Sequence, residues 1–254
     1  MPHHTTEAEA SFTMQHAVVY HDTIPELLQE RLQLQFQPQG STFIICSTKK
    51  QFLEQLIPFV SGHHSAHTAA PEGSAHAEEE HESERPHSFL NPTLQLLSSS
   101  KAITLAFCPT IDTLRAYLSA FNYTATDQAK AKSSPRASLL IVDLILLHHG
   151  TSEFSVQGLM RSLAAAVESA ARNHVELQLC ECRDMHDLQN PDRGPRLWDA
   201  QVPLLSGSVR LRGEDTEWSG RVVPVRSIAG RWLVFEDRER RSEQKASEDV
   251  EMLL

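Results

Sequence analysis

Residues 138–143 read Ser-Leu-Leu-Ile-Val-Asp, and this stretch decides the fold class. Its apolar residues follow one another without interruption, which is typical of a strand buried on both faces of a parallel sheet. Across residues 155–171 the apolar residues take helical spacing instead, and Ser155 is available as the N-cap. A second apolar strand, residues 175–180, follows at once. Strand, helix and strand in this order predict a right-handed βαβ unit.

Two more apolar runs fit the same sheet, at residues 41–46 and 102–108, and we expect both to be buried strands. Each is followed by residues with helical spacing, over 52–60 and 111–121. Ligands of open parallel sheets bind outside the carboxyl ends of the strands, and Asp143 stands at such an end. The sequence therefore predicts an α/β domain with its ligand edge near Asp143.

The C-terminal part has a different pattern, which predicts antiparallel strands in a β meander. Gly213 and Gly230 stand at the expected turns. The expected strands are residues 208–212, 221–226 and 231–235. The predicted fold class is therefore a mainly parallel central sheet flanked by helices, followed by an antiparallel meander.

One domain is expected over residues 16–236, because the remaining stretches lack an apolar period. Residues 1–15 are predicted to be a disordered tail, residues 61–88 a disordered acidic insertion rich in His, and residues 237–254 a charged tail. These three stretches carry nearly all of the net charge of −10, so the folded part is close to neutral. A local basic surface therefore remains compatible with the composition. No apolar run is long enough for a membrane span, and we expect a protein with reduced cysteines and no secretory leader.

The sequence does not favour conventional enzyme chemistry. We expect residues 46–52 to form the first βα turn, and they contain no glycine to wrap a phosphate. Asp143 has the place of a Walker-B carboxylate, which would hold magnesium, and we interpret it as a degenerate Walker-B position. Without a phosphate loop we favour a strand-end Asp that caps the next turn over a metal role. Cys180 and Cys182 with His186 form only half of a zinc pattern. We predict no catalytic residue, no metal site and no cofactor, although an ATPase with an unorthodox loop stays open.

Basic residues gather beyond the carboxyl ends of two predicted strands. They are Lys49 and Lys50 after the strand at 41–46, and Arg183, Arg193 and Arg196 after the strand at 175–180. Lys and Arg contact a nucleic-acid backbone without reading its bases. We therefore predict that these five residues bind DNA; that they are ordinary surface charges is the alternative.

Several stretches resemble the RecA-like core of the eukaryotic recombinase paralogues. Gly194-Pro-Arg-Leu-Trp-Asp-Ala-Gln-Val-Pro203, continuing to Val209-Arg-Leu-Arg212, is similar to the Gly-x-x-Trp-x-x-x-Val segment and the following Arg-Leu strand of that family. Residues 221–235 resemble its closing hairpin, and residues 139–143 resemble its Walker-B strand. The family's Gly-x-x-x-x-Gly-Lys-Ser/Thr loop is absent.

A RecA-like chain of this size without the phosphate loop resembles the small, non-catalytic subunits of the Shu complex. The resemblance implies an accessory subunit that promotes recombinase filament assembly in homologous recombination, in the nucleus and away from membranes. It implies as partners a recombinase, a second RecA-like subunit or a SWIM-type zinc-finger protein, and single-stranded or forked DNA. RecA-like folds without the phosphate loop also form accessory subunits of Elongator, which acts in transfer-RNA wobble-uridine modification, and this is the alternative.

Overall fold

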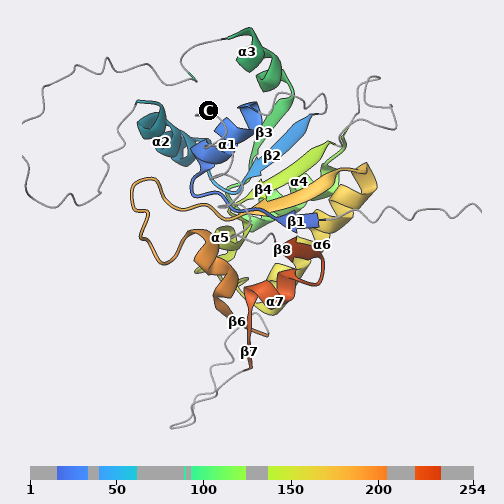
Figure 1. Cartoon of the computed structure of the whole chain (residues 1–254). Coiled ribbons are helices and arrows are strands. Elements are labelled where there is room, and N and C mark those ends of the chain that lie inside the picture. The colour runs from blue at the N-terminus through green and yellow to red at the C-terminus, as the bar shows by residue number, and fades with distance from the viewer. Residues whose placement is uncertain are drawn as a thin grey trace, which may run out of the picture.

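The computed structural model describes residues 16–33, 40–61, 89, 93–123, 137–204 and 221–235 (Figure 1). The predicted tails at 1–15 and 237–254 lie outside the described residues. So do nearly all of the predicted insertion at 61–88 and the predicted strand at 208–212. In the part of the chain that is described, no helix is long and apolar enough to cross a membrane.

A six-stranded, all-parallel sheet forms the centre of the protein, which confirms the predicted α/β class and the βαβ unit (Figure 1). Its spatial order is β3-β2-β4-β5-β1-β8. The strands are β1 His16–Val18, β2 Ser41–Ile45, β3 Ile103–Phe107, β4 Ser138–Val142, β5 Glu176–Cys180 and β8 Leu233–Phe235.

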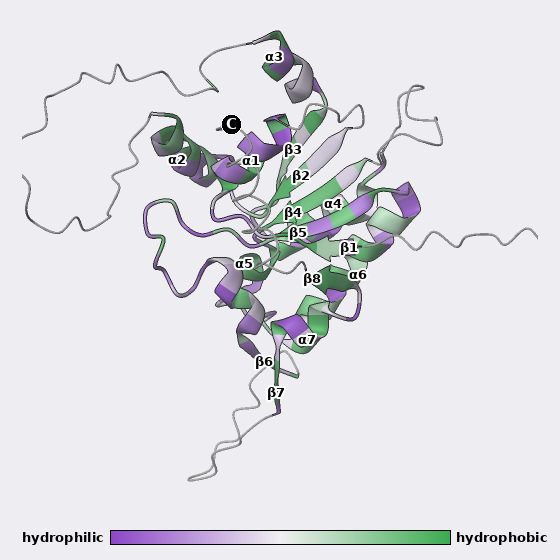
Figure 2. Ribbon diagram, in the orientation of Figure 1, coloured by the Kyte–Doolittle hydropathy of each residue, from purple (hydrophilic) through white to green (hydrophobic). Residues whose placement is uncertain are grey.

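Strand β4 shows why an unbroken apolar run specified this sheet. Leu139 and Ile141 face one core cluster, whereas Leu140 and Val142 face the other. Strand β4 therefore contributes to the hydrophobic core on both faces of the sheet. It is hydrophobic along its length in Figure 2. By contrast β3 lies at the edge, so Thr104 and Leu105 are exposed and the prediction of a fully buried strand there is wrong.

Helices cover both faces of the sheet. One layer holds α1 (Ile24–Gln33), α2 (Lys49–Val60) and α3 (Leu94–Lys101). The other holds α4 (Ile111–Ala120), α6 (Val156–Asn173) and α7 (Val225–Ala229), with α5 (Leu144–His148) and the 3₁₀ helix η3 (Gly194–Asp199) beside them. The predicted N-cap of α6 is confirmed, because the Ser155 hydroxyl accepts the Gly158 N–H at 3.1 Å.

The predicted C-terminal meander is wrong in its connections. Strands β6 (Gln201–Pro203) and β7 (Val222–Pro224) do pair antiparallel, as a separate two-stranded sheet. After Pro224 the chain forms α7 instead of continuing as a strand, since Val225, Ile228 and Ala229 are buried at helical spacing. Strand β8 then joins the central sheet parallel to β1 rather than closing a hairpin.

Candidate functional site

The connections of the sheet place a switch point between β2 and β4. The chain leaves β2 toward β3 through α2 and α3 on one face, and leaves β4 toward β5 through α6 on the other. Ligands of open parallel sheets bind at such a point, outside the carboxyl ends of the strands. Asp143 follows β4 directly, so its predicted place at the ligand edge agrees with the topology.

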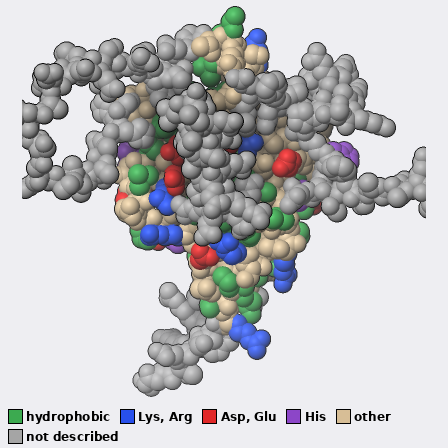
Figure 3. All heavy atoms as spheres, in the orientation of Figure 1, with side chains coloured by type: hydrophobic (Ala, Val, Ile, Leu, Met, Phe, Trp, Pro, Cys, Tyr) green, Lys and Arg blue, Asp and Glu red, His purple; other side chains and the backbone are tan. Residues whose placement is uncertain are grey.

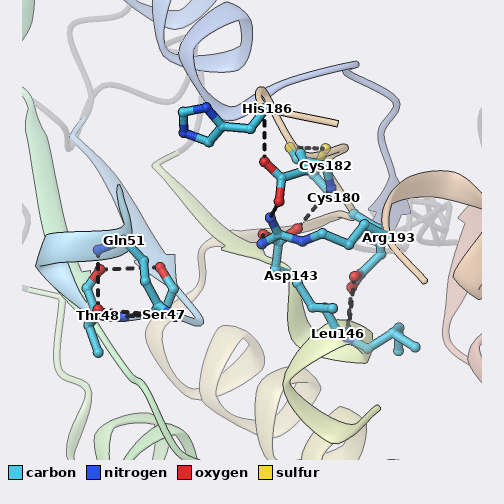
Figure 4. Close-up of polar contacts among 12 residues, drawn as sticks. Ser47, Thr48, Gln51, Asp143, Leu146, Cys180, Cys182, His186 and Arg193 are labelled. Atoms are coloured by element: carbon cyan, nitrogen blue, oxygen red, sulfur yellow. Dashed lines mark hydrogen bonds and ion pairs between the residues drawn. The ribbon is translucent and has the colours of Figure 1, made fainter. Parts of the chain in front are cut away.

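Asp143 is buried in a strained backbone position between β4 and α5. Its φ of 63° lies in the left-handed region, and its exposed fraction is 1%. Its Oδ1 accepts the Cys182 N–H at 2.8 Å, whereas its Oδ2 has no hydrogen-bond partner within the described part of the chain (Figure 4). Burial raises the pKa of Asp143 to about 6, although the Cys182 N–H and the Arg193 guanidinium lower it.

Glu181 is a second buried carboxylate at this edge, and the sequence did not single it out. It follows β5, and its oxygens accept the backbone N–H groups of Ile145 at 2.7 Å and Leu146 at 3.2 Å. It therefore caps α5, the helix that Asp143 begins. Burial first, and the neighbouring Asp143 next, raise the pKa of Glu181 well above its ordinary value. The available signal was an acidic residue ending a buried strand beside the strand that ends in Asp143.

The five predicted DNA-binding residues fall into two groups. Three are paired with carboxylates: Lys50 with Glu54 at 3.6 Å, Arg183 with Asp22 at 3.5 Å, and Arg193 with Asp184 at 2.6 Å and Asp143 at 3.8 Å. Lys49 and Arg196 are exposed, and neither has an ion pair among the described residues. On the face drawn in Figure 3, basic side chains of the described residues lie beside acidic ones.

The four cysteines lie at the carboxyl edge, and all four are buried with free thiols. The Cys180 and Cys182 sulfurs are 3.7 Å apart, and the neighbouring Cys180 thiol first, and burial next, raise the pKa of Cys182 well above its ordinary value. The His186 ring points away from both and donates to the Glu54 carbonyl at 3.2 Å (Figure 4). Across the described ranges, no group of three or more His, Cys, Asp or Glu side chains is arranged to hold a metal ion.

The first βα turn lies elsewhere than expected. Strand β1 precedes β2, so the first turn is residues 19–23, and the turn after β2 is the second. Residues 19–23 read Val-Tyr-His-Asp-Thr and contain neither glycine nor lysine. Neither turn therefore has the glycines that let backbone amides wrap a phosphate. A pocket of about 360 Å³ lies at the opposite, amino end of β2, beside Tyr117 and Tyr123, and includes no residue of this edge.

The edge thus combines two buried carboxylates, one inward-facing guanidinium and two exposed cations. The carboxylates are engaged by backbone N–H groups, and their main described roles are to position Cys182 and the start of α5. A scan with protein-family models gave no match, and searches of curated proteins and of solved structures gave none either.

Proposed function

We propose that this protein is a non-catalytic, RecA-like accessory subunit of a Shu-type recombinase-mediator complex, which binds DNA and promotes recombinase filament assembly. The observation that carries the proposal is the meeting of three stretches that resemble the recombinase paralogues. Arg193, next to the Gly194–Asp199 segment, pairs with Asp143 of the Walker-B-like stretch. Trp198 of that segment packs edge-on against Phe235, with ring centroids 5.3 Å apart.

The exposed cations give the proposal its nucleic-acid contact. Lys49 begins α2 after β2, and Arg196 lies in η3, which follows the residues after β5. Both belong to connections that leave the carboxyl edge, and both side chains are exposed. Lys50 is 86% exposed, and a surface ion pair such as its contact with Glu54 stabilises little, so a phosphate can take the place of Glu54. Because Lys49 and Arg196 need not leave a carboxylate first, we assign the first contacts with the DNA backbone to these two residues, and Lys50 can add a further one.

Fluorescence anisotropy with a labelled single-stranded oligonucleotide tests this assignment. In the Lys49→Ala, Arg196→Ala double variant we expect weaker binding for every sequence. The slope of log affinity against log salt should become shallower by about 1.4, at about 0.7 per phosphate contact in single strands. The matched control is Lys101→Ala with Arg231→Ala, which removes two exposed cations at the amino end of the same sheet. An unchanged slope in the first variant, or equal losses in both, contradicts the assignment.

Purification of the tagged protein from its native cells at moderate salt tests the assembly. Stoichiometric recovery of a recombinase, a second RecA-like protein or a SWIM-finger protein supports the proposal. Recovery of Elongator subunits overturns it and moves the function to transfer-RNA modification.

A further inference from the structure

Residues 183–194 form a loop, here called the strap, whose two ends pack against each other. Gly194 has a φ of +79°, and a Cβ on it would lie 2.8 Å from the Arg183 Cγ, so this end of the strap requires glycine. No residue from 183 to 193 is buried, although the structure describes all of them. A compact surface loop with adjoining ends is an Ω-loop. Since it buries little apolar surface, the strap is held to the domain mainly by polar contacts.

Within the described part of the chain, contacts with Asp22, Glu54 and Asp143 hold the strap in place. The Arg183 N–H donates to the Asp22 carbonyl at 2.7 Å, and Arg183 also pairs with the Asp22 carboxylate. His186 donates to the Glu54 carbonyl at 3.2 Å. At the far end, Arg193 approaches Asp143. The first two contacts each use a backbone carbonyl, which cannot change charge, together with one exposed ionisable group, the Asp22 carboxylate or the His186 ring. Asp143 is the buried ionisable group beneath the strap.

The Asp143 carboxylate beneath the strap is incompletely satisfied. Its Oδ2 is buried without a hydrogen bond from any residue that the structure describes, and the nearest guanidinium nitrogen of Arg193 is 3.8 Å away, beyond hydrogen-bonding distance. The other terminal nitrogen of Arg193 is committed to Asp184, at 2.6 Å. A buried carboxylate with one unpaired oxygen is costly when charged and much less so when protonated.

We propose that the strap is a proton-controlled cover, which closes over protonated Asp143 and opens when Asp143 is ionised. Opening admits water to the carboxylate, and the charged form gains far more from hydration than the neutral form. The groups that face Asp143 are Arg193 and Asp184 of the strap, Glu181 and Cys182 after β5, and Cys46 after β2.

The charges around Asp143 determine whether its protonation favours the closed or the open strap. Asp184 opposes the charge on Asp143, whereas Arg193 and the Cys182 N–H favour it, and burial outweighs both favourable contacts. The closed strap therefore binds a proton at Asp143 more tightly than an open strap with a hydrated carboxylate. By linkage, proton uptake favours the closed strap and proton release favours the open one. This inference does not depend on the proposed binding of DNA.

Hydrogen–deuterium exchange of the full chain, followed by mass spectrometry, tests the cover at pH 5.0 and 7.5. After correction for intrinsic exchange rates, we expect strap amides to exchange about tenfold faster at pH 7.5 than at pH 5.0. Amides of α6 serve as the internal reference. Strap exchange that does not depend on pH, or that is faster at pH 5.0, overturns the proposal.

Asp143→Asn separates this cover from a simple ionic latch, and Arg193→Gln tests the cation of the cover. Asp143→Asn mimics the protonated side chain and keeps a residue type that tolerates positive φ, so strap exchange should stay slow at both pH values. A latch held by the Asp143 charge predicts the opposite, namely fast exchange at both. Arg193→Gln should speed exchange at pH 7.5, because it removes the cation and leaves the carboxylate. Asp22→Asn and His186→Gln remove the other two ionisable groups of the strap contacts and leave Asp143 intact. They are the matched controls, and both should keep the pH dependence.

Discussion

Replacing Asp143 by Asn should stabilise the whole fold at neutral pH. Burial raises the pKa of Asp143 from 3.8 to about 6, and this difference corresponds to about 3 kcal/mol at about 1.4 kcal/mol per pKa unit. The folded state holds the proton more tightly than the unfolded state, so this stability is complete below pH 3.8 and is lost as pH rises through 6. Asn carries no such charge, and Asn also tolerates the φ of 63°.

Urea unfolding of the wild type and the Asp143→Asn variant at pH 4.5, 6.0 and 7.5 measures the effect. At pH 7.5 the free energy of unfolding of the variant should exceed that of the wild type by up to about 3 kcal/mol, which corresponds to a melting temperature about 6–12 °C higher. The gain should shrink steadily toward pH 4.5. Asp192→Asn, at an exposed position of the strap, is the control for a change of charge alone. A variant less stable than the wild type at pH 7.5 would refute the reasoning, because the Arg193 and Cys182 contacts would then outweigh the burial of the charge.

Substitutions at Glu181, Gly158 and Trp198 test the packing of the fold. Glu181→Gln leaves only one acceptor for the N–H groups of Ile145 and Leu146, so urea unfolding should show a loss of about 1–3 kcal/mol. Gly158→Ala places a Cβ 2.1 Å from the Glu153 carbonyl oxygen, so it should lower the free energy of unfolding by about 1–3 kcal/mol, which calorimetry detects as a lower melting temperature. Ala164→Ser, on the exposed face of the same helix, should change the free energy of unfolding by no more than about 0.5 kcal/mol. Trp198→Ala should lower the free energy of unfolding, measured with urea, by about 3–5 kcal/mol. Trp198→Phe should lose less than half as much, because Phe keeps an aromatic ring in the core, while the indole N–H that it removes is buried without a partner among the described residues; equal losses contradict this explanation.

Local pattern was enough to predict the central strands but not the strand pairing at the end of the chain. Strand β4 is buried on both faces, so its apolar run identified it without knowledge of its neighbours. Strands β1 and β8 have three residues each, and they pair with each other across most of the sequence. A strand of three residues has too short a pattern to specify a partner. The apolar pattern over residues 221–226 was equally ambiguous, because a buried strand and the start of a buried helix such as α7 both require apolar residues there.

The candidate site was predicted in position more fully than in chemistry. The rule that ligands gather at carboxyl strand ends located Asp143 correctly at the sheet edge. The same rule located Arg183 and Arg193 near that edge, but the carboxylates that pair with them were not foreseen. Asp22 precedes Arg183 by most of the chain, and only the pairing of β1 with β5 brings the two together. The sequence alone therefore overstated how many of the predicted DNA-binding residues lack a carboxylate partner among the described residues.

The arrangement around Asp143 is costly if the closed structure is the only state in which the protein works. A neutral Asn would satisfy the same backbone angle and accept the same Cys182 N–H, without the burial of a charge. Ionisable groups with raised pKa values gather at sites where a protein changes state or binds a ligand, and Asp143 and Glu181 are adjacent and both raised. An open strap gives the Asp143 charge water and frees Arg193 from one of its two carboxylates. The cost of the buried charge is thus accounted for if opening at neutral pH is part of how this edge meets its ligand.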